Sequence, residues 1–221
     1  MKLRLPLVYP ILDTVAIART GLNAVEAAEA LLEGGAEILQ YRHKAFWSRD
    51  TLAEAETIAR LCRGAGALFI INDRADYAAM LGAGLHVGQE DLTPADARRV
   101  IGSEAILGFS THNPGQMTAA QSEPVDYVAF GPVFATDSKE RLAATVRVAG
   151  LAAVRALTSK PLVAIGGITQ DRAPACWNAG ADSVAIIGGM MAQVRTRTAL
   201  RDRMTEWRRL SGRRAPTLHG F

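Results

Sequence analysis

The sequence has few of the residues that mark several common protein classes. It contains two cysteines in 221 residues, Cys62 and Cys176, and their separation matches neither a zinc site nor a redox pair. Both fall in segments that we predict to be helical, so we expect buried, apolar thiols. No apolar run reaches the roughly 20 residues that a membrane-spanning helix needs. Residues 1–6 lack the long apolar region of a signal peptide, so we expect a cytoplasmic protein with no membrane partner.

The chain also has little excess of charge of either sign. Its formal net charge is +3, and much of the positive charge lies late, in residues 195–214. No aromatic stripe or recognition motif accompanies that charge, so we expect a solvated helix face and no nucleic-acid partner. Hydrophobic residues make up 49% of the chain, which is enough for a large core.

Short apolar runs alternate with helix-like segments along the whole chain. The runs show almost no polar alternation, which is typical of strands buried on both faces of a parallel sheet. We predict strands near residues 7–12, 38–39, 68–71, 85–87, 106–109, 127–130, 163–165 and 184–187. We predict helices at residues 24–33, 48–63, 91–101, 114–122, 150–158, 171–178 and 193–210, and a short one at 74–81.

Eight βα units in about 200 residues favour one closed barrel over an open doubly wound sheet. The predicted fold is therefore α/β, a single (β/α)8 TIM barrel over residues 1–210, followed by a flexible C-terminal tail at 211–221. In such a barrel the C-terminal ends of all strands face one mouth. Almost every apolar run here ends in a polar cluster, so we expect these clusters to form one active site.

Two carboxylates follow neighbouring strands of the predicted barrel. Asp73 comes after the third apolar run and Asp91 after the fourth. Hard oxygen ligands on adjacent strands suit Mg²⁺, which usually binds one or two carboxylates together with substrate phosphates. Either residue alone could instead be a helix N-cap, Asp91 in particular. As a pair they indicate a magnesium site.

Three cations are expected near that pair. Arg42 and Lys44 are spaced to point the same way beyond the second strand, and Lys139 follows the sixth. Arginine binds phosphate oxygens as a planar fork and lysine binds them as a mobile point charge. Beside a magnesium site they indicate a diphosphate, although a solvated loop would also explain Arg42 and Lys44.

Glycine pairs end the last two strands, at residues 166–167 and 188–189. Barrels often bind phosphate there through bare backbone N–H groups, because glycine lets the chain approach the ligand closely. Tight turns alone are the alternative explanation. Two anion sites in one mouth would mean two phosphorylated substrates or one very long one.

The chain shows no obvious nucleophile. Ser110, Thr111 and His112 offer hydrogen-bonding groups after the fifth strand, but no Ser-His-Asp triad or Cys-His pair is apparent. His86 lies within an apolar strand, so we interpret it as a satisfied core histidine rather than a catalytic base. The polar clusters are therefore suited to holding anions.

Six segments of the sequence resemble the motifs of a known family and occur in the same order. They are Gln40-Tyr41-Arg42-His43-Lys44, Ile71-Asn72-Asp73-Arg74, His86-Val87-Gly88-Gln89-Glu90-Asp91, Ser110-Thr111-His112, the run from Gly131 to Lys139, and Ile165-Gly166-Gly167-Ile168. Together they resemble the thiamine-phosphate synthase family, part of a superfamily with the TenI-like proteins, over roughly residues 7–190. Any one segment would be a weak signal, but six in register are strong.

The resemblance implies a transferase that joins two small-molecule substrates. These are 4-amino-5-hydroxymethyl-2-methylpyrimidine diphosphate and 4-methyl-5-(2-phosphooxyethyl)thiazole, and the products are thiamine phosphate and diphosphate. By the resemblance, Asp73 and Asp91 hold Mg²⁺. The residues implied to hold the pyrimidine diphosphate are Gln40, Arg42, Lys44, Asn72, Ser110 and Lys139, of which Arg42, Lys44, Ser110 and Lys139 are implied to be catalytic. The residues implied to bind the thiazole phosphate are Thr136, Ser138, Gly167, Ile187 and Gly188, and Tyr41, His43 and Asp137 belong to the same substrate-binding motifs.

This reaction explains the missing nucleophile. An electron-rich aminopyrimidine can expel diphosphate to leave a stabilised cation, which the thiazole nitrogen then captures. The protein has to neutralise the leaving group and hold both partners in line. Residues 137–148 are the natural candidate for a lid that excludes water.

The sequence departs from the family pattern at a few positions. Gly188 stands where a serine is usual, which removes a side-chain contact to phosphate but keeps the backbone N–H. Ser183 replaces a usual glycine. These changes bear on thiazole-phosphate affinity and leave the magnesium and diphosphate sites complete.

Two alternative functions remain open from the sequence. A thiazole tautomerase of the sister family would carry a histidine after the glycine of the sixth strand, where this chain has Pro132. A non-catalytic phosphate-binding barrel would leave the carboxylate pair and Lys139 unexplained. The sequence does not decide whether the chain forms a homo-oligomer.

Overall fold

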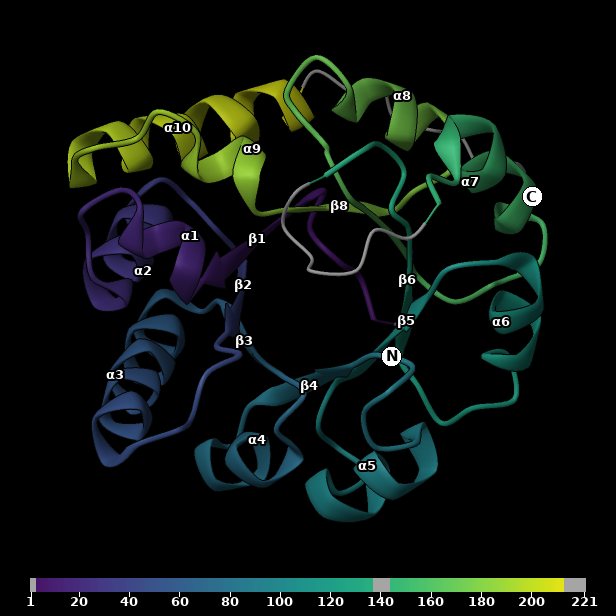
Figure 1. The fold of residues 1–221 in the computed structure, drawn as a ribbon, viewed down its shortest axis with the longest axis horizontal. Helices are drawn as coiled ribbons and strands as arrows, with labels where there is room; N and C mark the ends of the chain where they lie inside the picture. The colour runs from purple at the N-terminus through teal and green to yellow at the C-terminus, as the bar shows by residue number, and fades with distance from the viewer. Residues whose placement is uncertain (1–2, 137–143, 213–221) are drawn as a thin grey trace.

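Eight parallel strands close into a barrel in the computed structural model, which describes residues 3–136 and 144–212. Each strand pairs with the next along the chain, and β8 pairs with β1 (Figure 1). The strands are β1 (Val8–Asp13), β2 (Ile38–Arg42), β3 (Leu68–Asn72), β4 (Gly84–Val87), β5 (Leu107–Thr111), β6 (Tyr127–Phe130), β7 (Leu162–Ile165) and β8 (Ser183–Ile186). The predicted (β/α)8 barrel is confirmed.

Helices surround the barrel as an outer layer (Figure 1). They are α1 (Thr14–Ala18), α2 (Ala24–Glu33), α3 (Arg49–Ala65), α4 (Ala75–Leu81), α5 (Pro94–Ile101), α6 (Pro114–Ala119), α7 (Arg147–Arg155), α8 (Ala173–Asn178), α9 (Gly188–Met191) and α10 (Arg197–Gly212). Local sequence sets several of their ends. Asn23 and Glu26 form a capping box at the start of α2, and Ser48 caps α3 as predicted.

Some helix boundaries differ from the predicted ones for identifiable reasons. Gly64 does not end α3; the helix continues to Ala65, and Gly66 after it takes the left-handed conformation that glycine adopts without strain. The helix predicted from residue 91 begins at Pro94, because Thr93 supplies the capping oxygen. The short helices α1 and α9, which lie beside each other near β1, were not predicted (Figure 1). Helix α10 extends to Gly212, and residues 213–221 lie outside the described residues.

The strands are buried on both faces, as the unbroken apolar runs predicted. Ile38 packs inside the barrel with Tyr9 and Ile70, whereas the next residue, Leu39, packs in the layer between barrel and helices. Side chains alternate in this way because successive residues of a strand point to opposite faces. The same alternation continues to the strand end, so Gln40 and Arg42 belong to the inner face of β2.

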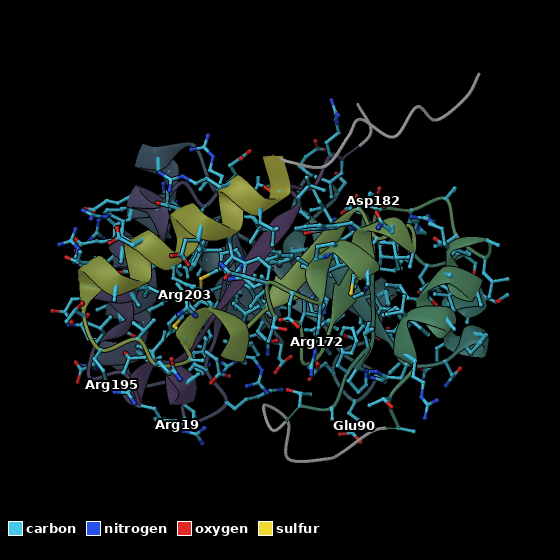
Figure 2. All side chains as sticks on the ribbon, turned by 90° about the horizontal axis from the view of Figure 1, so that it is seen from above. Arg19, Glu90, Arg172, Asp182, Arg195 and Arg203 are labelled. Carbon is cyan, nitrogen blue, oxygen red and sulfur yellow. The ribbon has the colours of Figure 1, made fainter. Side chains whose placement is uncertain are left out.

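The positions of a few side chains show which end of the barrel is the mouth. Arg19, Glu90, Arg172 and Arg195 follow β1, β4, β7 and β8, and they lie toward one end, whereas Asp182, which precedes β8, lies at the other (Figure 2). The first end is therefore the mouth into which the strands run.

Within the described residues, no helix is long and apolar enough to cross a membrane. The two cysteines are buried, as predicted, and burial raises the pKa of Cys62 to about 12 and that of Cys176 to about 11.

Helix α10 packs tightly against the end of α2, and this contact gives a first prediction. A Cβ atom on Gly34 would lie 2.6 Å from Met204 Cβ and 2.7 Å from the Arg201 carbonyl oxygen. Gly34→Ala is therefore expected to lower the free energy of unfolding by about 1–3 kcal/mol, because overpacking forces the helices apart. Urea unfolding measures the change.

Gly64→Ala is the matched control. Gly64 lies within α3, and a Cβ atom there would meet nothing within 4 Å. Alanine is favoured over glycine in a helix by roughly 0.5–1 kcal/mol, so this variant is expected to be slightly more stable. Equal stability of Gly34→Ala and the parent would contradict the packing of α10 on α2.

Candidate active site at the barrel mouth

A buried ion pair positions Arg42 at the mouth. Asp13 and Arg42 are register partners at the ends of β1 and β2, and their side chains form a salt bridge. Asp13 Oδ1 also accepts a hydrogen bond of 2.9 Å from the Ala16 N–H and so caps α1. The two side chains are 7% and 16% exposed, so Asp13 holds the guanidinium in place where water does little to screen the pair.

Asp73 lies between a lysine and a second carboxylate. Lys44 Nζ donates to Asp73 Oδ2 in an ion pair. Burial raises the pKa of Asp73, Lys44 acts against that rise, and the neighbouring Asp91 raises the pKa further through a shared hydrogen bond and charge repulsion. Asp73 and Asp91 therefore lie side by side, as the sequence predicted. Two carboxylates so placed repel each other, and a divalent cation would relieve the repulsion, so the pair fits Mg²⁺.

Neither aspartate caps a helix. Thr93 Oγ1 accepts from the Asp96 N–H and caps α5, whereas Asp91 Oδ2 accepts from the Gly88 N–H at 2.6 Å. Helix α4 begins after Arg74 without any side-chain cap. The helix-cap interpretation of Asp91, which the sequence left open, is thus wrong.

Two further features of the β3 end point to a bound group. Asp73 has a φ of 64°, in the left-handed region that few residues other than glycine adopt. Strain of this kind collects at functional sites, where the surrounding structure compels it. The preceding residue, Asn72, is buried, and its Nδ2 donates no hydrogen bond within the described part of the chain. An unpaired buried donor beside the carboxylate pair fits an acceptor supplied by a substrate.

Gln40 and Ser110 lie inside the barrel, 3% and 7% exposed. Gln40 Nε2 donates to the Tyr9 hydroxyl at 3.0 Å, and Ser110 Oγ lies 2.8 Å from His86 Nε2. The Ser110 carbonyl also accepts a hydrogen bond of 2.6 Å from Gln89 Nε2. Both predicted binding residues are therefore held by partners deeper in the barrel or at its rim.

Tyr41 and His43 lie on the other face of β2. Tyr41 is fully buried in the layer between barrel and helices, and its hydroxyl donates to Glu54 at 2.6 Å. Its ring stacks on His43, whose Nδ1 lies 3.0 Å from Thr14 Oγ1. The structure does not bring Tyr41 to the barrel mouth, because odd and even residues of a strand face opposite ways.

The glycines after β7 allow two loops to meet. A Cβ atom on Gly166 or Gly167 would collide with residues 132–135 of the loop after β6. Both glycines have positive φ, 102° and 59°, and the Phe134 N–H donates to the Gly166 carbonyl at 3.0 Å. Glycine is therefore needed here for the close approach of the two loops, and this approach places the pair against the loop that leads to Thr136.

The surroundings of Gly188 are open. A Cβ atom there would meet nothing within 4 Å, so the backbone at the start of α9 is accessible. Ile187, which precedes it, is half-buried and packs on the cluster inside the barrel. Thr136 is the last described residue of its loop, and Asp137, Ser138 and Lys139 lie outside the described residues, as does most of the predicted lid.

Sequence reasoning missed Asp13, although a signal for it exists. Asp13 follows the first apolar run, just as Asp73 and Asp91 follow the third and the fourth. Tyr9 and Tyr127 were also missed, because a tyrosine in an apolar run reads as core. Their hydroxyls lie 2.9 Å apart across the inside of the barrel.

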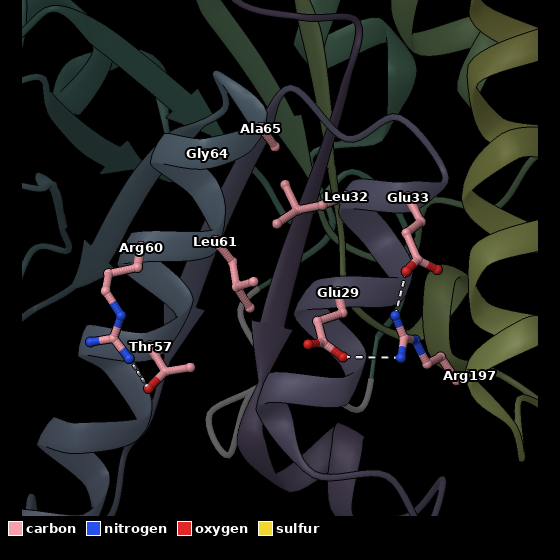
Figure 3. Close-up of a pocket in the computed structure, with 9 residues that line it drawn as sticks. All are labelled: Glu29, Leu32, Glu33, Thr57, Arg60, Leu61, Gly64, Ala65 and Arg197. Atoms are coloured by element: carbon pink, nitrogen blue, oxygen red, sulfur yellow. Dashed lines mark hydrogen bonds and ion pairs between the residues drawn. The ribbon is translucent and has the colours of Figure 1, made fainter.

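A groove also opens on the outer surface between α2 and α3, with a volume of about 690 Å³ (Figure 3). Arg197 borders it and forms ion pairs with Glu29, at 3.2 Å, and with Glu33. None of the residues that line it belongs to the predicted site, so the candidate active site is the mouth.

Comparison with known proteins matches the thiamine monophosphate synthase family over residues 8–190. The chain belongs to this family. It is 44% identical over 200 residues to the thiamine-phosphate synthase of Koribacter versatilis, covering 89% of this chain and 94% of that protein. It is 40% identical over 185 residues to that of Laribacter hongkongensis, covering 83% and 86%. The solved structure of thiamine phosphate pyrophosphorylase from Pyrococcus furiosus superposes with a TM-score of 0.75 at 31% identity, covering 90% of this chain and 96% of that one. The predicted family, and with it a transferase of the thiamine-phosphate synthase type, is confirmed.

Proposed function

We propose that this chain joins 4-amino-5-hydroxymethyl-2-methylpyrimidine diphosphate to 4-methyl-5-(2-phosphooxyethyl)thiazole, giving thiamine phosphate and diphosphate. The observation that carries the proposal is the meeting of the Asp73–Asp91 pair with Arg42 and Lys44 at one barrel mouth. Paired carboxylates beside two cations suit a metal-bound diphosphate. The relatives from Koribacter versatilis and Laribacter hongkongensis, which this chain matches over most of their length, are named thiamine-phosphate synthase, and that name points to the same reaction.

Mg²⁺ is the proposed cofactor, and Asp73 and Asp91 are its proposed ligands. When bound, the ion would neutralise charge on the departing diphosphate. Lys44 already contacts Asp73, so the lysine can move its Nζ toward a phosphate oxygen while the carboxylate turns to the ion. Lys44 thus balances the charge of Asp73 until the metal ion and the substrate bind.

The remaining groups of the site bind and orient. Arg42 is held by Asp13 and presents its guanidinium to the diphosphate with little reorganisation, which is what makes a preorganised donor effective. Lys139, assigned from the sequence motif, is proposed as a further cation at the leaving group. Gln40, Asn72 and Ser110 are proposed to hold the pyrimidine, so that the carbon losing diphosphate faces the second substrate.

The thiazole phosphate is proposed to bind on the opposite side of the mouth. The open backbone at Gly188, with Gly167 and Ile187, suits a phosphate contacted by N–H groups. Thr136, Asp137 and Ser138 complete the proposed set from the sequence motif. Cytoplasmic location and assembly into a homo-oligomer stay predictions.

Product analysis tests the proposal directly. Incubation of the purified protein with both substrates and Mg²⁺ is expected to yield thiamine phosphate, identified by mass spectrometry. A thiazole tautomerase would isomerise its thiazole and leave the pyrimidine diphosphate intact, and a non-catalytic barrel would bind ligands without turnover. Either of those results from folded protein would contradict the proposal.

A further inference from the structure

A chain of hydrogen bonds runs through the inside of the barrel between two proposed substrate-binding residues. It begins at Gln40 Nε2, which donates to the Tyr9 hydroxyl. The Tyr9 and Tyr127 hydroxyls lie 2.9 Å apart, and Tyr127 lies 2.9 Å from His86 Nδ1. His86 Nε2 then lies 2.8 Å from Ser110 Oγ, which ends the chain on the far side of the mouth.

We propose that this chain of hydrogen bonds fixes which atoms Gln40 and Ser110 present to the substrate. Tyr9, Tyr127 and His86 are then positioning residues. The inference rests on the proposed function, because it concerns recognition of the pyrimidine. Tyr9, Tyr127 and His86 are all buried inside the barrel, 1%, 0% and 7% exposed. Their effect on the substrate passes through the two end residues.

The direction of the hydrogen bonds follows from counting hydrogens. Tyr9 accepts from Gln40, so its own hydrogen is free to be donated to Tyr127. Tyr127 then donates to His86 Nδ1, and His86 Nε2–H donates to Ser110 Oγ. In the opposite sense, the Tyr9 hydrogen would have no acceptor in a fully buried position, which is costly. Burial raises the pKa of both tyrosines, so both hydroxyls keep their hydrogens at neutral pH.

The two ends of the chain therefore have opposite character at the mouth. Gln40 uses its amide nitrogen inside the barrel, and its Oε1, which accepts no hydrogen bond among the described residues, is left as an acceptor. Ser110 accepts from His86 and keeps its hydroxyl hydrogen to donate. An acceptor and a donor suit a ring that carries an amino group and an unprotonated ring nitrogen, as the aminopyrimidine does.

Gly108 is the residue that allows the chain of hydrogen bonds to be continuous. It lies on β5 between its register partners, His86 on β4 and Tyr127 on β6. A Cβ atom there would collide with the Tyr127 ring and hydroxyl and with His86 Nδ1. Because glycine leaves this space empty, Tyr127 and His86 stack across β5 with ring centroids 5.5 Å apart.

Tyr127→Phe tests the inference because it keeps the ring and removes one link. Tyr9 then lacks an acceptor for its hydrogen and regains one only by donating to Gln40 Oε1, which turns the amide over. Gln40 would present its amide nitrogen, a donor, to the mouth. The variant is therefore expected to lose preference for an amino group and to tolerate an oxo group in its place.

The measurement is the dissociation constant, by calorimetric titration, of the aminopyrimidine diphosphate and of its 4-oxo analogue in the presence of Mg²⁺. Wild type is expected to bind the amino compound at least about 100-fold more tightly, and Tyr127→Phe to reduce that ratio by about 10-fold or more. Tyr9→Phe, which frees the Gln40 amide, is expected to reduce it as well, and it decides the matter if Tyr127→Phe does not fold.

Ser183→Ala is the matched control. Ser183 is the first residue of β8, so it lies at the end of the barrel opposite the mouth and away from both proposed substrate sites. It is fully buried and its hydroxyl has no partner among the described residues, so the variant removes a buried hydroxyl that is not part of the hydrogen-bond chain. Its ratio is expected to equal that of wild type. An unchanged ratio in both folded tyrosine variants, with wild type still selective, would overturn the inference alone. Failure of wild type to bind the amino compound would overturn the proposed function, and the inference with it.

Discussion

Asp91→Asn is expected to lower the Mg²⁺-dependent rate of thiamine phosphate formation by about 1,000-fold, corresponding to several kcal/mol of lost charge stabilisation. Asparagine can still accept the Gly88 N–H bond that Asp91 Oδ2 accepts at 2.6 Å, so the loop keeps its shape. What the variant loses is the negative charge beside Asp73. Steady-state rates at increasing Mg²⁺ measure the change, and circular dichroism verifies the fold.

The metal-free Asp91→Asn protein is expected to be at least as stable as the parent, because the substitution removes repulsion between two carboxylates. Asp96→Asn is the control: this exposed carboxylate lies in the first turn of α5 and contacts Thr93 and Arg99. Its activity is expected to match the parent. Full activity in Asp91→Asn at every Mg²⁺ concentration would remove this residue from the site.

Arg42→Met is expected to lower kcat/KM for the pyrimidine diphosphate by about 100- to 1,000-fold, the usual effect of losing one preorganised donor to developing negative charge. It is also expected to destabilise the protein by about 3 kcal/mol, because Asp13 is left as a buried carboxylate without its partner. Activity assays and urea unfolding measure the two effects separately.

The double variant Asp13→Asn/Arg42→Met separates binding from stability. Asparagine keeps the cap on α1, since its side-chain oxygen can accept from the Ala16 N–H. With the unpaired charge gone, most of the lost stability is expected to return while the activity stays low. If activity recovered together with stability, Arg42 would be a structural residue and the proposed diphosphate contact would be wrong.

The barrel could be predicted from the sequence because its signals are local. Strands buried on both faces appear as unbroken apolar runs, and several helices carry their own N-cap residues, such as Ser48 at the start of α3. Asp73 and Asp91 could be placed together because the order of strands around a closed barrel follows the order along the chain. The family motifs then added the reaction.

The contacts that cross the barrel could not be predicted. Tyr127 follows Tyr9 by 118 residues, and nothing in their spacing announces a hydrogen bond between them. His86 was interpreted as a satisfied core histidine, and it is satisfied, but its partners include Ser110 at the mouth. Gly108 appeared as an ordinary strand residue, since its role depends on side chains from two neighbouring strands.

Tyr41 shows the limit of carrying a motif over as a block. It stands between Gln40 and Arg42 in the segment that identified the family, yet its hydroxyl contacts Glu54 in the helix layer. The two-residue period of the strand separates it from its neighbours. Within a motif that lies on a strand, alternate residues face opposite sides of the sheet, so their roles have to be assigned separately.

One barrel mouth is expected to bring a metal-bound diphosphate and a second phosphorylated substrate together for reaction. The most direct measurement is diphosphate release by the purified protein while the pyrimidine diphosphate, the thiazole phosphate and Mg²⁺ are omitted in turn. Release that requires all three, with an equal amount of thiamine phosphate formed, is the predicted result. Absence of release from folded protein with all three at saturation would contradict it.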